Sequence, residues 1–268
     1  SAVPGLSTGL PDVDMAISGL NKSDLILLAA RPGMGKTSFA LNMLLHAGKF
    51  SGKTVVFFSL EMSREQLAMR LISGESFVDN KKLVTGKLGE EDWTKIAAAS
   101  AALNQTQILI DDNPSLSVAD MNAKCRRVDN LGLVVIDYLQ LMTSAGGPTR
   151  SGDNRQQIVS DISRALKIMA KELNVPVVCL SQLSRGPESR SDKRPMLSDL
   201  RESGAIEQDA DIVMFLYRDD YYNDSDENHN LAECIIAKNR HGETRTVELQ
   251  WLPEYTTFSS IDRRHSEY

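Results

Sequence analysis

The sequence has 268 residues, 41% of them hydrophobic, and a formal net charge of −6. This length is enough for one large core, and no Pro/Gly/Ser linker divides it, so we expect one domain. The apolar runs are far shorter than a membrane span and the N-terminus lacks signal-peptide order, which predicts a cytoplasmic protein with no membrane partner. Three scattered cysteines without a CxxC spacing indicate neither a disulfide framework nor a zinc site. The negative charge argues against an entirely basic surface but leaves room for a local basic lining.

The first clear element is a short apolar strand, Leu25–Ala29, followed by a glycine-rich turn and a helix over Ser38–Lys49. The turn reads ARPGMGKT, which matches the phosphate-binding P-loop except that Ala30 stands where the first glycine usually lies. Gly33 and Gly35 fall where bare backbone must wrap an anion, at the N-terminus of the helix. The pattern predicts a nucleotide triphosphatase; the alternative is a glycine-rich turn that binds nothing.

Two side chains of this turn carry the chemistry. Lys36 would place a positive charge on the β and γ phosphates, and the Thr37 hydroxyl would bind Mg²⁺. The residues that we expect to bind the nucleotide are Arg31, Pro32, Gly33, Met34, Gly35, Lys36, Thr37 and Ser38.

Strands and helices then alternate along the chain. Further strands are expected at Thr54–Phe58, Ile108–Ile110, Leu133–Ile136, Val177–Leu180 and Ile212–Leu216. The capping-box pairs Ser63 with Gln66 and Ser117 with Asp120 open two of the intervening helices. Other helices are expected at Glu91–Leu103 and from about Asn154 to Leu173. Because the strands are nearly all apolar, we predict a mainly parallel sheet covered by helices on both faces.

The last third of the chain has a different pattern. Glu233–Lys238 and Thr244–Trp251 are predicted strands with few residues between them, so they should form an antiparallel hairpin. Its tip would be Asn239–Gly242. The expected fold class is therefore α/β, with a mainly parallel sheet and a C-terminal antiparallel hairpin.

Ligands in open α/β sheets lie beyond the carboxyl ends of the strands, so acidic residues that follow a strand are candidates for the Mg²⁺ shell. Asp137 follows Leu133–Ile136 in the manner of a Walker B carboxylate. Asp111 and Asp112 also follow a strand, but the Asn-Pro-Ser stretch after them explains these acids as turn formers. We favour Asp137.

Two more strand-end residues are candidates for the chemistry. Glu61 lies between the second strand and the helix cap at Ser63, where its carboxylate could act as the general base for an attacking water. Gln182 directly follows Val177–Ser181 and could hydrogen-bond the γ-phosphate. A solvated loop glutamate and a polar strand terminus are the alternatives.

Two long connections at this edge, Thr143–Gln157 and Leu183–Asp211, are rich in basic residues and contain no Phe, Tyr or Trp. Loops this long are usually functional or disordered, and their cations could follow a nucleic acid backbone with little base preference. Interleaved acidic residues leave a solvated segment as the alternative. Lys238 and Arg240 at the hairpin could be ordinary polar residues or could reach a neighbouring subunit's nucleotide as an arginine finger.

The blocks ARPGMGKT, SLEM, LVVIDYLQLM, VVCLSQLSR, SDLRESGAIEQDAD and IIAKNRHGET occur in order between about Ser7 and Ile261. Together they resemble the C-terminal RecA-like motor domain of the DnaB family of replicative hexameric DNA helicases. The resemblance implies a RecA-like P-loop fold, with Lys36 and Thr37 on ATP and Mg²⁺. It implies Glu61 as catalytic base, Asp137 in Walker B and Gln182 as the γ-phosphate sensor.

The resemblance further implies that Lys238 and Arg240 act across a subunit interface. It also implies that Arg201, Glu202 and Gly204 hold single-stranded DNA by its phosphates. The helicase activity that it implies has 5′ to 3′ polarity. Bacterial members carry an N-terminal domain and a linker helix that this sequence lacks. We therefore expect residues 1–20 to be an arm after the missing linker and residues 21–268 to be the motor.

The expected partners are single-stranded DNA and further copies of this chain in a hexamer. A helicase loader is a possible partner, whereas primase is not expected, since the family binds it through the N-terminal domain. Two rival functions stay open: a RecA-type strand-exchange ATPase and a nucleotide-dependent interaction module.

Overall fold

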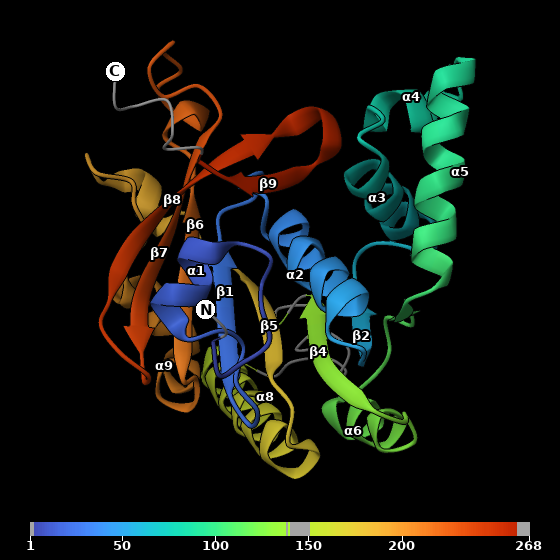
Figure 1. The fold of residues 1–268 in the computed structure, drawn as a ribbon. Helices are drawn as coiled ribbons and strands as arrows, with labels where there is room; N and C mark the ends of the chain where they lie inside the picture. Colours follow the sequence, from blue (N-terminus) through green and yellow to red (C-terminus); the bar gives the residue numbers. More distant parts are fainter. Residues whose placement is uncertain (1–2, 138, 140–150, 262–268) are drawn as a thin grey trace.

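The computed structural model describes residues 3–137, 139 and 151–261, apart from the side chains of residues 151–155 and 201–204. This part of the chain contains a nine-stranded sheet in the order β3-β2-β4-β5-β1-β6-β7-β8-β9 (Figure 1). Its strands are β1 (Leu25–Ala30), β2 (Thr54–Ser59), β3 (Gln107–Asp111), β4 (Leu131–Asp137), β5 (Val177–Gln182), β6 (Ile212–Tyr217), β7 (Leu231–Asn239), β8 (Arg245–Leu252) and β9 (Thr257–Ser260).

The six strands from β3 to β6 in this order pair in parallel, and β6, β7, β8 and β9 pair antiparallel. This arrangement confirms the predicted α/β fold and its C-terminal hairpin. The hairpin is extended by β9, which the sequence pattern does not predict. A strand of four residues is too short to show a clear alternation of apolar and polar side chains.

Helices cover both faces of the sheet (Figure 1). They are α1 (Pro11–Ile17), α2 (Lys36–Phe50), α3 (Arg64–Ser76), α4 (Asn80–Thr85), α5 (Glu90–Asn104), α6 (Val118–Arg126), α8 (Ser151–Leu173) and α9 (Gly204–Asp209). Short 3₁₀ helices are η1 (Gly186–Ser189), η2 (Leu197–Ser203), η3 (Asp219–Tyr221) and η4 (Pro253–Tyr255).

Two apolar cores lie on the two faces of the sheet, because successive strand residues point in opposite directions. The even-numbered residues of β1 pack into the core formed with α1 and α2, and the odd-numbered residues pack into the core formed with α6 and α8. Every residue of β1 is therefore buried. This burial on both faces is the physical reason for the continuous apolar strands in the sequence.

The helix starts follow the predicted caps. The hydroxyl of Ser63 accepts a hydrogen bond from the Gln66 N–H at 3.2 Å, and the Gln66 side chain accepts from the Ser63 N–H at 3.0 Å. Ser117 and Asp120 form the same reciprocal pair at the start of α6. Helix α1 is not indicated by apolar periodicity, although Pro11 lies at a first-turn position that suits proline.

The N-terminal segment packs against the core that contains α2. Leu10, Val13 and Ile17 are buried in the core beside α2, and Leu6 pairs with Leu20 in an isolated antiparallel bridge. Within the described ranges, no helix is both long and apolar enough to cross a membrane. The three cysteines, Cys125, Cys179 and Cys234, are buried as free thiols, and burial raises the pKa of each to about 12.

Loss of the α3 cap should lower stability. In Ser63→Ala, the Gln66 N–H loses its acceptor, so we expect the free energy of unfolding to fall by about 1 kcal/mol in urea titrations. Ser63→Asp keeps a side-chain acceptor at the cap and is the matched control. Equal stability of Ser63→Ala and the parent protein would contradict a stabilising role for this cap.

Candidate functional site

A cavity of about 560 Å³ lies where the carboxyl ends of β1, β2 and β5 face the start of α2. The predicted residues that line it are Arg31, Pro32, Gly33, Gly35, Lys36, Thr37, Ser38, Glu61 and Gln182. The strand order β2-β4-β5-β1 places β5 beside β1 and separates β2 from β5 by β4 alone. Residues distant in the sequence thus meet at one edge of the sheet, as expected for a ligand site in an α/β fold.

The P-loop backbone needs both of its glycines. Gly33 and Gly35 have φ values of +83° and +97°, a region that residues with a side chain rarely adopt. A Cβ atom on Gly33 would lie 3.0 Å from the Tyr221 ring, and one on Gly35 would lie 2.8 Å from Phe258. Ala30, in contrast, is an ordinary buried residue of β1, so no glycine is required there.

Lys36, Thr37 and Asp137 form the polar centre of the loop. The Lys36 ammonium donates to Asp137 Oδ1 at 3.1 Å, and the Thr37 hydroxyl donates to Asp137 Oδ2 at 2.8 Å. Asp137 is fully buried. A buried carboxylate beside a hydroxyl is a set of hard oxygen donors, which fits a cation such as Mg²⁺.

The rival acids lie elsewhere. Asp111 accepts from the Lys124 ammonium at 2.5 Å and from the Asn113 N–H at 3.0 Å. Asp112 accepts from the Arg64 N–H at 2.9 Å. The Asn113 contact of Asp111 fits the turn-forming interpretation, whereas Asp112 instead contacts the start of α3. Asp137 is the strand-end carboxylate beside the P-loop.

Glu61 and Gln182 line the same cavity as Lys36. Arg70 of α3 also lines it, although no motif points to this residue. Its i+4 spacing from Gln66 is the sequence signal that places both side chains on one face of α3. Burial lowers the pKa of the Arg70 guanidinium, while the carboxylates of Asp137 and Glu61 act in the opposite direction. The cationic side chains that line the cavity therefore include Arg70 as well as Arg31 and Lys36.

The C-terminal strands contribute to the cavity as well. Trp251 of β8 and Thr256 lie in its wall. The Arg218 guanidinium donates to the Gly33 carbonyl at 2.8 Å and lies 5.3 Å from the centroid of the Trp251 ring. Only the tertiary fold brings these residues to the P-loop.

Two residues of the predicted nucleotide-binding loop, Met34 and Arg31, have side chains that contact other parts of the chain. Met34 does not line the cavity, because the whole residue is 1% exposed and its side chain belongs to the core. Arg31 lines the cavity but donates to the Leu183 carbonyl at 2.7 Å and pairs with Glu188 at 3.2 Å. Arg31 therefore ties the P-loop to the segment that follows β5.

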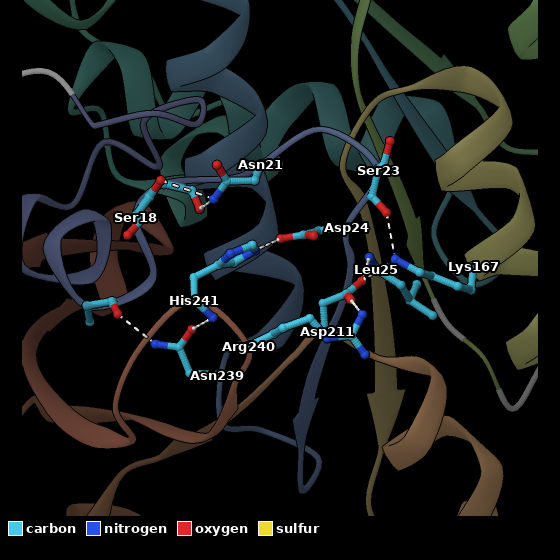
Figure 2. A network of polar contacts seen from close by, with 12 residues as sticks. Ser18, Asn21, Ser23, Asp24, Leu25, Lys167, Asp211, Asn239, Arg240 and His241 are labelled. Carbon is cyan, nitrogen blue, oxygen red and sulfur yellow. Dashed lines mark hydrogen bonds and ion pairs between the residues drawn. The ribbon is translucent and has the colours of Figure 1, made fainter.

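Lys238 and Arg240 do not line this cavity. Asn239 at the end of β7 pairs with Ile212 at the start of β6, so the hairpin tip lies at the amino ends of the parallel strands. Lys238 Nζ donates to the Glu207 carbonyl at 2.6 Å, and Arg240 forms an ion pair with Asp211 (Figure 2). Within one chain, the hairpin tip lies at the amino ends of the parallel strands and the P-loop lies at their carboxyl ends.

Several basic residues of the connection between β5 and β6 are already paired within the chain. Arg190 donates to both Asp199 oxygens at 2.8 and 2.9 Å, and Arg194 pairs with Glu233 at 3.0 Å. These contacts favour an internal role for the two arginines. In the same connection, Arg201 and Glu202 lie in η2 and Gly204 begins α9, but their side chains are outside the described part of the chain, as are residues 143–150 of the first basic loop.

Comparisons with known proteins identify the family of the chain. Residues 5–260 match the family described as the DnaB-like helicase C terminal domain. The chain is 53% identical to "Replicative DNA helicase DnaB" of Geobacillus stearothermophilus and 51% identical to "Replicative DNA helicase DnaC" of Bacillus subtilis. Each match includes 99% of this chain but 58% of the relative, so the chain spans less than two thirds of these proteins.

Solved structures give the same result. One that is described as an ATPase domain is 41% identical, with a TM-score of 0.90 over 97% of this chain and 92% of that one. Another, described as a DnaB-like replicative helicase and its interactions with primase, is 40% identical, with a TM-score of 0.91 over 98% of this chain and 63% of that one. The RadB recombinase, at 17% identity and a TM-score of 0.59, shares the RecA-like fold alone. From its fold, its P-loop cavity and these matches, the chain belongs to the DnaB-like helicase C-terminal domain family.

Proposed function

We propose that this chain is the ATP-hydrolysing motor of a replicative DNA helicase, which moves along single-stranded DNA and separates the duplex. The observation that carries this proposal is the placement of the two halves of the chemistry. Lys36, Thr37, Asp137 and Glu61 lie at the P-loop edge, whereas Arg240 lies at the opposite edge of the sheet. The relatives named as replicative helicases support the choice of activity.

In this proposal, the backbone around Gly33 and Gly35 and the start of α2 bind the phosphates of ATP. Lys36 leaves Asp137 for the β and γ phosphates, and Glu61 orients and deprotonates the attacking water. Mg²⁺ held by Thr37 and Asp137 would neutralise charge that develops on the phosphate oxygens. Gln182 would sense the γ-phosphate through a hydrogen bond.

A further cation for the site would come from a second copy of the chain. A head-to-tail contact joins unlike surfaces of two identical chains, so each P-loop edge can receive the hairpin tip of the next chain. Lys238 and Arg240 would then act in trans on the neighbour's nucleotide. A head-to-tail contact closes into a ring when its rotation allows, and we propose a ring of six, as the family resemblance implies.

The ring would enclose one DNA strand and hold its phosphates through Arg201, Glu202 and Gly204. Because the acidic chain has a net charge of −6, DNA binding would depend on this local lining. We expect a cytoplasmic location and leave a helicase loader as a possible partner. One solved relative is named for its interactions with primase. The family resemblance implies that such contact is made by the N-terminal domain.

The two rival functions predict different behaviour. A strand-exchange ATPase would form open filaments and pair DNA strands, and the likeness to RadB at 17% identity supports a shared fold alone. An interaction module would bind nucleotide without needing turnover. Electron microscopy of closed rings, combined with assays of unwinding and strand pairing, separates the first rival from the helicase.

Variants of Lys36 and Glu61 test the nucleotide site. Lys36→Ala should abolish ATP binding or turnover, because the phosphates lose their main positive charge. Glu61→Gln should retain ATP yet lower kcat by about 10²-fold or more, because a neutral amide cannot act as the base. Equilibrium ATP binding and DNA-stimulated phosphate release at high protein concentration measure the two effects. Unchanged biological activity of Glu61→Gln would favour the interaction module.

Arg240→Ala tests the trans contact. ATP binding should persist, while DNA-stimulated kcat should fall by about 10³-fold, the scale of a lost arginine finger. Arg245→Ala is the matched control, since Arg245 lies on the same hairpin and donates to the Asp12 carbonyl at 3.1 Å. Equal losses in the two variants would contradict a specific role for Arg240.

Arg201→Ala tests backbone tracking. We expect weaker binding of single strands of any sequence and a salt dependence that is flatter by about one unit of slope. Arg126→Ala is the control, because Arg126 is an exposed arginine of α6 that pairs with Glu172 of α8. Fluorescence anisotropy at several salt concentrations gives both quantities. A loss confined to certain sequences would contradict contact with phosphates.

A further inference from the structure

A buried carboxylate, Asp211, lies beside Arg240 of the hairpin tip (Figure 2). Asp211 is 1% exposed. Its Oδ2 accepts hydrogen bonds from the Leu25 N–H at 2.8 Å and from the Lys167 ammonium at 2.7 Å. Its Oδ1 has the Arg240 guanidinium as an ion-pair partner and receives no aligned hydrogen bond. The carboxylate is thus held on one side and offers its other oxygen to Arg240.

The main chain of Arg240 is tied to the same residue. The Arg240 N–H donates to the Asp211 carbonyl at 3.0 Å, and the Asp211 N–H donates to the Leu25 carbonyl at 2.8 Å. Arg240 is therefore fixed at its backbone and at its guanidinium by one aspartate, which is itself fixed to the first residue of β1. Such double attachment restricts an otherwise flexible arginine side chain.

A second contact steadies the tip. His241 Nε2 pairs with Asp24, the residue before β1, and the Asp24 carbonyl accepts from the Val177 N–H at 2.9 Å at the start of β5. Asn239 donates to the Ala16 carbonyl at 2.8 Å (Figure 2). The hairpin tip is thereby joined to α1 and to the central strands of the sheet.

Structural stability alone does not account for this arrangement. Lys167, only 15% exposed in its side chain, already supplies one positive charge to the Asp211 carboxylate. Arg240 is a second cation on the same group, and its side chain remains 53% exposed. A guanidinium has five N–H donors in a planar fork, so contact through Nη1 leaves donors for another anion. The pair can thus persist while Arg240 meets a phosphate.

We propose that Asp211 is a positioning residue for the trans-acting Arg240. The carboxylate orients the guanidinium and the Asp24–His241 contact fixes the tip, so that the remaining N–H donors face the γ-phosphate in the neighbouring subunit. This inference rests on the proposed role of Arg240. It adds a residue that would act through Arg240 and that lies at the opposite end of the strands from the P-loop of its own chain.

Asp211→Asn is the first test. The amide still offers an oxygen to the Leu25 N–H but loses the charge that holds Arg240. We expect DNA-stimulated kcat to fall by about tenfold to a hundredfold while KM for ATP is unchanged, as for a misplaced group that acts in the transition state. Asp209→Asn removes a nearby carboxylate that accepts from Ser163 Oγ at 2.7 Å, and it should retain the parent kcat.

The Arg240→Ala background separates positioning from structure. If Asp211 acts through Arg240, Asp211→Asn should cause no further loss of the residual kcat in that background. An equal fold-loss in both backgrounds, or a rise in KM without a change in kcat, would overturn the proposal. Thermal melting and ATP binding monitor the fold. If Asp211→Asn does not fold, His241→Ala is tested in the same two backgrounds, and an unchanged kcat then overturns the proposal.

Mixed assemblies separate this inference from the function on which it rests. Lys36→Ala subunits have a defective P-loop and an intact tip, so they should restore single-turnover hydrolysis when mixed with Arg240→Ala subunits. The same restoration is expected with Asp211→Asn subunits. Restoration with Arg240→Ala but not with Asp211→Asn would overturn the positioning role alone. Absence of restoration with Arg240→Ala would overturn the trans action of Arg240.

Discussion

The buried contact of Asp137 with Lys36 and Thr37 is the interaction on which the site depends. A carboxylate with no exposure needs a cation or hydroxyl partners, and the start of α2 supplies both. This requirement fixes the P-loop against the end of β4, across the intervening strand β5. The same geometry gathers Glu61, Gln182 and Arg70 around one cavity. The charges assembled there suit a triphosphate better than any neutral ligand.

The sheet also separates the nucleotide site from the residues proposed to complete it. Parallel strands end at the P-loop edge, and the antiparallel strand β7 returns the chain to the opposite edge. Arg240 and the P-loop of one chain are therefore kept apart by the length of the strands. In the proposed motor, a contact between copies would overcome this separation, which is why the proposal requires an assembly and not a single chain.

The contacts at the hairpin tip are connected to the P-loop through one strand. Strand β1 begins at Leu25, which exchanges backbone and side-chain hydrogen bonds with Asp211, and it ends where the P-loop begins. One continuous, fully buried strand thus connects a chain's own nucleotide site to the arginine that it would offer to the next chain. Close packing on both faces makes such a strand stiff, so the two edges are held in a fixed relation.

The sequence by itself determined the strand–turn–helix of the P-loop, the two capping boxes and the hairpin, because each depends on residues close together in the chain. It also indicated a mainly parallel sheet, because nearly all-apolar strands alternate with helices. It also pointed to Asp137 over Asp111 and Asp112 through local turn chemistry. Tertiary structure alone decided that Ala30 needs no positive φ, that Trp251 and Arg70 enter the cavity, and that Arg190 and Arg194 are paired internally. The tertiary structure alone paired Asp211 with Arg240. These outcomes depend on contacts between residues far apart in the chain. Strand order and register bring those residues together, and local periodicity specifies neither of them.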